Sequence, residues 1–208
     1  MARNKRKGQA RRDSSGKTWL LWGGFAAVIA AVLLLVAVSQ AGLVADSAPG
    51  PSLERRIAAP DFQLTLYQGA DVLGSDQLQF SDAFGQGKPV VLNFYAGLCP
   101  PCRAEMPGFQ KVYDGSGQQF ILLGLDIGPF IGLGSNDDGR RLLQELSITY
   151  PAGTTAQANT VSAYNVLGMP TTVFITSDGT ILETHAGLLD ETSLREKVEA
   201  LIRATEAS

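Results

Sequence analysis

The sequence predicts an α/β fold in which a mixed central sheet carries helices on both faces, preceded by one N-terminal transmembrane helix. From residue 58 onward, stretches with strand patterns alternate with stretches with helix patterns, and two strand patterns near the C-terminus flank a hairpin turn. A long uncharged apolar stretch precedes this region. We therefore divide the chain into a basic segment (1–17), a membrane anchor (18–39), a linker (40–57) and an α/β domain (58–208).

The N-terminal region joins a cluster of positive charge to the apolar stretch. Seven of the chain's 17 Lys and Arg residues lie within its first 17 positions, and residues 19–38 carry no charge over 20 positions. A helix of that length spans about 30 Å, the thickness of a bilayer's hydrocarbon core. Because positive charge stays on the cytoplasmic side, we expect a cytoplasmic N-terminus and an extracytoplasmic domain in the cell membrane.

An alternative is a secretory signal cleaved near Ser39-Gln40-Ala41, although the apolar region of such signals usually has only about 7–15 residues. Both interpretations place the domain outside the cytoplasm. Residues 40–57 are rich in Gly, Ala, Ser and Pro and predict a linker. Beyond the basic segment the chain is acidic, so we expect no nucleic-acid partner.

The first half of the domain contains two strands that should be buried on both faces. Residues 63–67 alternate polar and apolar side chains, as a strand with one buried face does, and residues 81–84 suit a short capped helical turn. Residues 89–96 and 120–127 are nearly continuously apolar, which is typical of central strands. A helix should lie between these two strands, from the cysteines to about Tyr113.

The second half should form two further helices, a hairpin and a closing helix. Asp137 or Asp138 could cap a helix through Leu146, and residues 157–166 suggest another short one. Residues 171–176 and 180–185 flank Ser-Asp-Gly, a hairpin turn signal. The last helix should begin after a capping aspartate, Asp190. It should bury one apolar face, formed by Leu194, Val198, Leu201 and Ile202.

The chain's two cysteines, Cys99 and Cys102, lie three positions apart. A purely structural disulfide over so short a loop constrains little chain entropy. A structural zinc site needs four ligands, and the only histidine is His185, which we expect at the surface. A c-type haem needs histidine where Arg103 stands. A redox dithiol needs only the two cysteines, so we predict a redox-active disulfide without metal or cofactor.

The position of the motif explains how it could react. Cys99 should lie at a helix N-terminus, where unpaired N–H groups and the helix dipole stabilise a thiolate. We therefore expect Cys99 to be the exposed nucleophile and Cys102, one turn later, to close the disulfide. Pro100 and Pro101 are tolerated in the first turn, where N–H groups have no helical partner.

Residues 90–107, VVLNFYAGLCPPCRAEMP, resemble the active-site segment of TlpA/ResA-type thioredoxin-like proteins. Residues 59–64, APDFQL, are similar to an opening motif that these proteins share with peroxiredoxins, and residues 168–172, GMPTT, to the loop with the family's cis-proline. Glu105 falls where ResA-type members carry an active-site glutamate, and Pro107 matches a helix-kinking proline. The resemblance covers about residues 58–203 and implies a thioredoxin-like fold with an extra strand–helix insertion within residues 115–165.

A peroxidase is the rival that the opening motif suggests. Peroxiredoxins would need Pro and Thr seven and three positions before the reactive cysteine, where Leu92 and Ala96 stand, so we discount it. The chain also departs from its own family. Leu98 replaces the usual Trp before the first cysteine, and the Gly-rich stretch 128–134 does not match the family pattern.

The resemblance implies a membrane-anchored protein-disulfide reductase for exported proteins, with a role in cytochrome c biogenesis and electrons from a membrane thiol-transfer protein. Cys99 would attack a substrate disulfide, and Cys102 would release the product. A thiol oxidant or isomerase with the same site, and a non-catalytic module that binds thiol-containing clients, remain alternatives.

Glu105, Met169 and Pro170 complete the predicted site. Glu105 is either a solvated helix residue or a buried carboxyl group with a raised pKa that serves Cys102 as a base. Asn93 stands where thioredoxin has a buried aspartate, and an asparagine cannot titrate. We therefore favour Glu105 as the base. The resemblance implies that the Met169–Pro170 bond is cis and that these two residues bind substrate through extended backbone. Arg103 should be a solvated cation beside the site.

Overall fold

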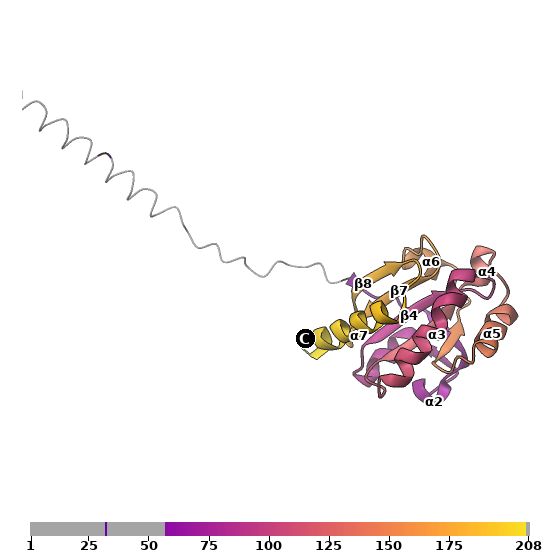
Figure 1. The fold of residues 1–208 in the computed structure, drawn as a ribbon, viewed down its shortest axis with the longest axis horizontal. Coiled ribbons are helices and arrows are strands. Elements are labelled where there is room, and N and C mark those ends of the chain that lie inside the picture. Colours follow the sequence, from indigo (N-terminus) through magenta and orange to yellow (C-terminus); the bar gives the residue numbers. More distant parts are fainter. Residues whose placement is uncertain (1–31, 33–56, 207–208) are drawn as a thin grey trace, which may run out of the picture. The chain divides into compact units, whose positions relative to one another are not determined.

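The computed structural model describes Val32 and residues 57–206 (Figure 1). The predicted basic segment, the membrane anchor at 18–39 and the linker at 40–57 therefore fall outside the described residues, apart from Val32 and Ile57. Within the described part of the chain, no helix is long and apolar enough to cross a bilayer.

The described residues form one mixed sheet of eight strands in the order β1-β8-β7-β4-β5-β6-β2-β3. The bounds are β1 (Ile57–Ala58), β2 (Gln63–Gln68), β3 (Gln77–Gln79), β4 (Val90–Tyr95), β5 (Ile121–Asp126), β6 (Ala152–Thr154), β7 (Thr171–Ile175) and β8 (Thr180–Ala186). β4 pairs in parallel with β5 and antiparallel with β7, which confirms the mixed sheet. β1, β3 and β6 have three residues or fewer, too few to give a recognisable pattern.

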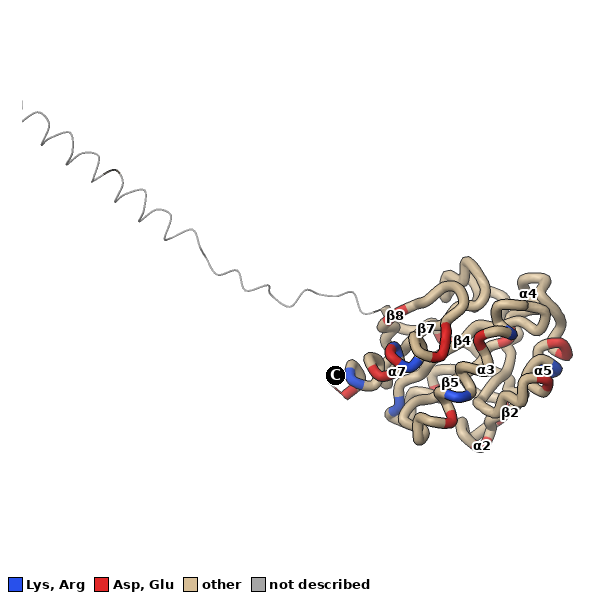
Figure 2. Tube along the Cα trace, viewed as in Figure 1, with Lys and Arg blue, Asp and Glu red and all other residues tan. Residues whose placement is uncertain are grey.

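Helices cover both faces of this sheet (Figure 1). They are α2 (Ala70–Leu73), the 3₁₀ helix η1 (Phe80–Gln86), α3 (Pro100–Gly115), α4 (Gly128–Ile131), α5 (Asn136–Glu145), α6 (Asn159–Ala163) and α7 (Glu191–Glu206). Side chains from α3, α5 and α7 share one core cluster, and side chains from η1 and α6 belong to the other or pack on it. Charged residues are frequent along α5 and α7 (Figure 2).

β4 and β5 are the centre of the core, because every residue in both strands is buried. Their side chains alternate between the two faces. Val91 and Tyr95 point toward the cluster under α3, α5 and α7, whereas Leu92 and Phe94 join the opposite cluster. These two layers of apolar side chains explain why both strands lack the polar alternation of a half-exposed strand.

The predicted helix starts are confirmed except for one cap. Ser135, not Asp137 or Asp138, caps α5: its hydroxyl accepts from the Asp138 N–H at 3.3 Å, while the Asp138 carboxylate accepts from the Ser135 N–H at 2.8 Å. This reciprocal pair is a capping box, so the acidic residue occupies its third position rather than the cap itself. Asp190 caps α7 as predicted, accepting from the Ser193 N–H at 2.9 Å.

The topology gathers several loops at one edge of the sheet. β4, β5 and β6 are parallel, so their C-terminal ends lie together. β7 is antiparallel to β4 and therefore begins at this edge, and β8 ends there. Four connecting segments thus meet at the edge where α3 begins: residues 96–99, 127–135, 155–170 and 187–190. This edge is where a site built from several loops can form.

Candidate active site

Cys99 and Cys102 form a disulfide at the N-terminus of α3, with their Cα atoms 5.3 Å apart. Cys99 is the N-cap residue, and its sulfur accepts a hydrogen bond from the Cys102 N–H at 3.3 Å. Pro100 and Pro101 occupy the first turn, as predicted. The cysteine at position 99 is therefore placed where a helix N-terminus favours a thiolate once the disulfide opens.

The expectation of an exposed Cys99 is wrong for the disulfide form, because Cys99 is only 2% exposed and Cys102 is fully buried. The segment 128–134, the Gly-rich stretch that does not match the family pattern, packs against the neighbouring residue Leu98. The Leu98 N–H donates to the Leu133 carbonyl at 2.9 Å, and a Cβ on Gly134 would lie 3.1 Å from Leu98 Cγ. This segment therefore forms a wall of the site beside Leu98, which itself is 59% exposed.

The active-site loop, residues 96–99, also rests on the start of α5. A Cβ added at Gly97 would lie 2.3 Å from the Asp138 carbonyl carbon and 2.5 Å from the Gly139 nitrogen. No side chain fits at this position without moving backbone. The first turn of α5 therefore packs directly against the loop that carries the first cysteine.

Glu105 lies inside the protein rather than at its surface, since it is only 3% exposed. Its carboxylate accepts from Asn93 Nδ2 at 2.8 Å and from the Leu189 N–H at 3.0 Å. Burial raises the pKa of Glu105 from 4.5 to about 7, although both hydrogen bonds act in the opposite direction. The prediction of a buried carboxyl group with a raised pKa is confirmed, and the alternative of a solvated glutamate is wrong.

Asn93 connects this carboxyl group to the strand that follows the cis-proline. Its side chain is fully buried, and Nδ2 also donates to Thr172 Oγ1 at 3.1 Å. β4 and β7 place these two residues opposite each other in the sheet. Asn93 thus fixes the position of Glu105 relative to β7 without titrating itself.

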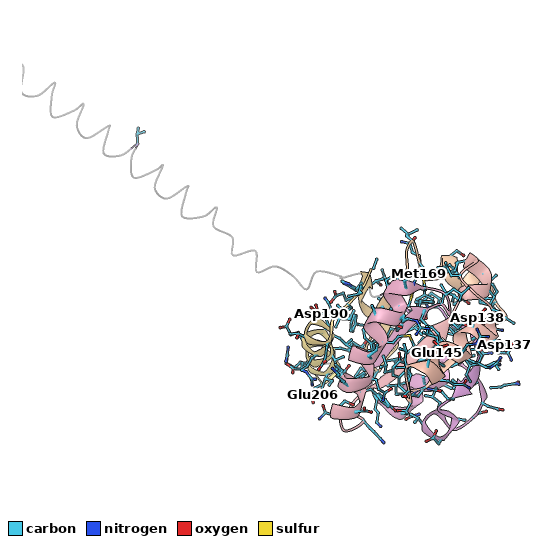
Figure 3. All side chains as sticks on the ribbon, turned by 45° about the vertical axis from the view of Figure 1, so that its right-hand side comes forward. Asp137, Asp138, Glu145, Met169, Asp190 and Glu206 are labelled. Carbon is cyan, nitrogen blue, oxygen red and sulfur yellow. A yellow bond between two sulfur atoms is a disulfide. The ribbon has the colours of Figure 1, made fainter. Side chains whose placement is uncertain are left out.

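The Met169–Pro170 peptide bond is cis, as the resemblance implied. Pro170 is buried and Met169 is partly buried, packing against both core clusters (Met169 is labelled in Figure 3). The Pro170 carbonyl accepts from the Gly187 N–H at 2.8 Å. Since the Leu189 N–H binds Glu105, the loop 187–189 links the cis-proline to the carboxyl group.

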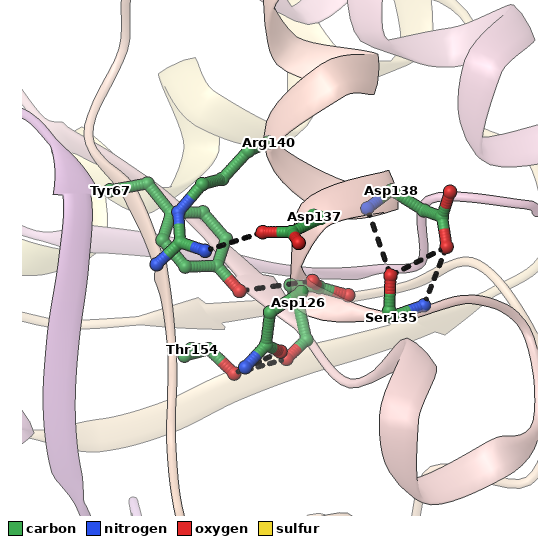
Figure 4. A network of polar contacts seen from close by, with 8 residues as sticks. Tyr67, Asp126, Ser135, Asp137, Asp138, Arg140 and Thr154 are labelled. Atoms are coloured by element: carbon green, nitrogen blue, oxygen red, sulfur yellow. Dashed lines mark hydrogen bonds and ion pairs between the residues drawn. The ribbon is translucent and has the colours of Figure 1, made fainter.

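The sequence analysis did not identify a second buried carboxyl group, Asp126, at the end of β5. Its side chain accepts from Tyr67 OH at 3.1 Å (Figure 4). It also accepts from the Gly128 N–H at 3.0 Å. The Arg140 guanidinium lies 4.2 Å from the centre of the Tyr67 ring. Burial raises the pKa of Asp126 from 3.8 to about 6. An acidic residue near the end of the otherwise apolar run 120–127, FILLGLDI, was the signal that could have identified Asp126.

Two other candidates lie outside this constellation. Arg103 is an exposed cation and forms an ion pair with Glu145 of α5. His185 lies in β8 opposite Thr172 and is partly exposed. The structure thus brings Cys99, Cys102, Glu105, Met169 and Pro170 to one edge of the sheet. The arrangement can perform dithiol–disulfide exchange with a carboxyl group at hand to move a proton.

Comparisons with known proteins agree with this geometry. Residues 56–184 match the AhpC/TSA family. The thiol-disulfide oxidoreductase ResA of Oceanobacillus iheyensis is 32% identical over 162 residues, which make up 76% of this chain and 79% of that protein. ResA of Geobacillus kaustophilus is 28% identical over 145 residues, 69% of this chain and 75% of that one.

The fold has a counterpart among solved structures. A thiol:disulfide interchange protein of the thioredoxin family from Chlorobium tepidum superposes with a TM-score of 0.57, at 21% identity, over 71% of this chain and 97% of that structure. At this identity the likeness concerns the fold alone, and it confirms the thioredoxin-like architecture.

Proposed function

The chain belongs to the AhpC/TSA family, where it groups with thiol-disulfide oxidoreductases of the ResA type, and from this premise we propose that it reduces disulfides of exported proteins outside the cytoplasm, including apocytochromes c. One observation carries the proposal. A disulfide at the N-terminus of α3 has, one turn after its inner cysteine, a buried carboxyl group with a pKa of about 7. Such a group can accept a proton near neutral pH.

The reaction consists of two exchanges. In the reduced protein, the Cys99 thiolate attacks one sulfur of the substrate disulfide, and the other substrate sulfur leaves with the electron pair and takes up a proton. Cys102 then loses its proton to the Glu105 carboxylate and attacks the Cys99 sulfur. The second substrate thiol is released, and the Cys99–Cys102 disulfide is restored.

The positions of the two cysteines support this division of roles. Both are buried in the disulfide form, but Cys99 is the N-cap of α3, where unpaired N–H groups stabilise a thiolate, whereas Cys102 lies within the first turn. The substrate would lie across Leu98 and the cis-proline, with its backbone beside Met169. To complete the cycle, a membrane thiol-transfer protein supplies two electrons as a dithiol, which becomes a disulfide.

The apolar residues 19–38 and the basic cluster before them support a membrane anchor with the domain on the outer side. A reporter enzyme fused after Ser208 should be active outside the cytoplasm. Activity of that fusion in the cytoplasm would contradict the proposed location while leaving the chemistry untouched.

The test of the chemistry is a pair of cysteine variants in the full-length protein. Cys99→Ser should abolish disulfide exchange, because the attacking sulfur is lost. Cys102→Ser should accumulate mixed disulfides with substrate, visible on non-reducing gels, because no sulfur remains to resolve them. If Cys99→Ser accumulates the mixed disulfides instead, Cys102 is the attacking cysteine and Cys99 the resolving one. Retained reductase activity in both variants would reject the site and leave a client-binding module as the better explanation.

A further inference from the structure

A groove opens beside the cis-proline, between α4 and α6. Its volume is about 470 Å³, within the range of roughly 300–1,000 Å³ that is common for ligand pockets. Its lining contains no charged side chain and is mainly apolar, with Phe130 from α4, Val161 from α6 and Leu167 from the segment before the cis-proline. Ser162 and Asn165 are its polar members.

The local backbone explains why this groove stays open. After α6 the chain reverses at Asn165, which has a φ of 52°, a left-handed conformation that asparagine tolerates. The Val166 N–H then donates to the Val161 carbonyl at 3.0 Å. Val161, Val166 and Phe130 pack against the core cluster of the sheet face below, whereas the reversal leaves Leu167 86% exposed.

One wall of the groove lies close in sequence to the segment proposed to bind substrate. Leu167 forms part of its lining and precedes Met169 by two residues, which separates their Cα atoms by at most about 7 Å. A client chain that pairs with the backbone at Met169 advances about 3.3 Å per residue. A side chain a few residues from the client's cysteine therefore reaches the groove.

We infer that this groove is a specificity subsite, which binds a bulky apolar side chain located a few residues from the reacting cysteine of the client. The inference rests on the proposed function for the choice of ligand. The uncharged lining excludes recognition of a phosphate or a carboxylate by ion pairing, and its apolar walls suit leucine, phenylalanine or a similar side chain. The exchange chemistry sets which bond breaks, and the groove sets which clients react fastest.

The test fills the groove while leaving the redox residues unchanged. Ser162→Trp places an indole in the groove from the exposed side of α6, and Ala163→Trp puts the same side chain on an exposed neighbour that is not in the lining. Leu167→Ser removes one apolar wall, with Leu182→Ser on exposed β8 as its control. Each variant is prepared as full-length protein.

Three disulfide probes separate the groove from the site. One is a peptide disulfide with Leu-Phe near the cysteine, one has Ser-Ser there, and one is a small aromatic disulfide. Ser162→Trp and Leu167→Ser should lower kcat/KM for the Leu-Phe peptide about 10-fold, the lower end of what a lost hydrophobic contact changes. Rates with the other two probes, and all rates of the two control variants, should stay within about 2-fold.

A binding measurement keeps this inference distinct from the proposed function. A fluorescent Leu-Phe peptide with serine in place of cysteine should bind the unsubstituted protein more tightly than Ser162→Trp, and it requires no exchange. Equal binding by both proteins, or equal loss of rate on all three probes, would overturn the subsite. Failure of every probe to be reduced, with the binding difference intact, would overturn the proposed reaction and retain the groove.

Discussion

Two buried carboxyl groups, Glu105 and Asp126, have raised pKa values for the same reason and yet occupy different settings. Desolvation is the largest cause of the shift in both. Glu105 lies one helical turn from Cys102 and binds an amide side chain and a backbone N–H beside the cis-proline loop. Asp126 lies at the end of β5 and binds Tyr67 and the first residue of α4.

The difference shows that a raised pKa alone does not identify a catalytic acid or base. Structural networks shift pKa values as active sites do, so position decides the role. Glu105 stands near the sulfurs that exchange electrons. Asp126 holds together the segments that flank the active-site loop, since Gly139 of α5 packs on its carboxylate and Gly128 begins α4. We therefore assign proton transfer to Glu105 and positioning to Asp126.

The largest effect should appear in the pH dependence of stability, where both groups behave alike. Each pKa is higher in the folded state than in the unfolded chain, so each group's stabilising contribution is full below its unfolded pKa and is lost as the pH rises through the folded value. A rise from 4.5 to about 7 for Glu105, or from 3.8 to about 6 for Asp126, corresponds to about 3 kcal/mol.

Urea unfolding of the oxidised protein at pH 4 and pH 8 measures this contribution without titrating thiols. Glu105→Gln should reduce the loss of unfolding free energy between the two pH values by about 3 kcal/mol. Asp126→Asn should reduce it by about 2 kcal/mol, because pH 4 already lies just above the unfolded pKa of Asp126. The Asp126 contribution should disappear at lower pH than that of Glu105. Parallel curves for wild type and both variants would show that neither carboxyl group is perturbed.

The next effect separates the two groups in catalysis. Glu105→Gln should slow the resolving step near neutral pH by up to about 10²-fold, because it removes a positioned base. It should also lower the apparent pKa values of the thiols, since a nearby carboxylate disfavours a second negative charge. Asp126→Asn should leave the rate within about 3-fold, as expected for a group distant from the proton transferred.

Rates of disulfide exchange and of cysteine alkylation between pH 5 and pH 9 provide the comparison. Superimposable profiles for Glu105→Gln and wild type would remove Glu105 from the mechanism. A loss in Asp126→Asn as large as that in Glu105→Gln would instead make Asp126 part of the proton path.

The smallest effect should come from packing against Asp126. A Cβ at Gly139 would lie 2.0 Å from Asp126 Oδ2, whereas a Cβ at Gly108 in α3 has its nearest neighbour, Glu191 Cβ, at 3.3 Å. Gly139→Ala should therefore lower the free energy of unfolding by about 2 kcal/mol through overpacking. Gly108→Ala should change it by less than about 1 kcal/mol, since it has the same gain in helix propensity and Glu191 has to shift by only a few tenths of an ångström.

Thermal or urea unfolding of the two alanine variants tests this contrast. If Gly139→Ala is as stable as Gly108→Ala, the first turn of α5 is free to move away from Asp126, and its role as a support of the active-site loop is lost.

The sequence determined the central part of this protein because its signals are local. Continuous apolar runs identified β4 and β5, the turn between β7 and β8 predicted the hairpin, and two cysteines before a helix predicted the disulfide. Glu105 and the cis bond at Pro170 were predicted through the resemblance of residues 90–107 and 168–172 to the family's motifs. Each signal depends on a few consecutive residues, whose spacing fixes what they can form.

The tertiary structure decided what depends on distant segments meeting. No local pattern shows that residues 128–134 would pack against Leu98, that Tyr67 would reach Asp126 across 59 positions, or that Gly97 would rest on the first turn of α5. Burial and desolvation are properties of the assembled fold, because they depend on every side that packs around a group. The same applies to the groove beside the cis-proline, whose walls come from α4, α6 and the segment before Met169.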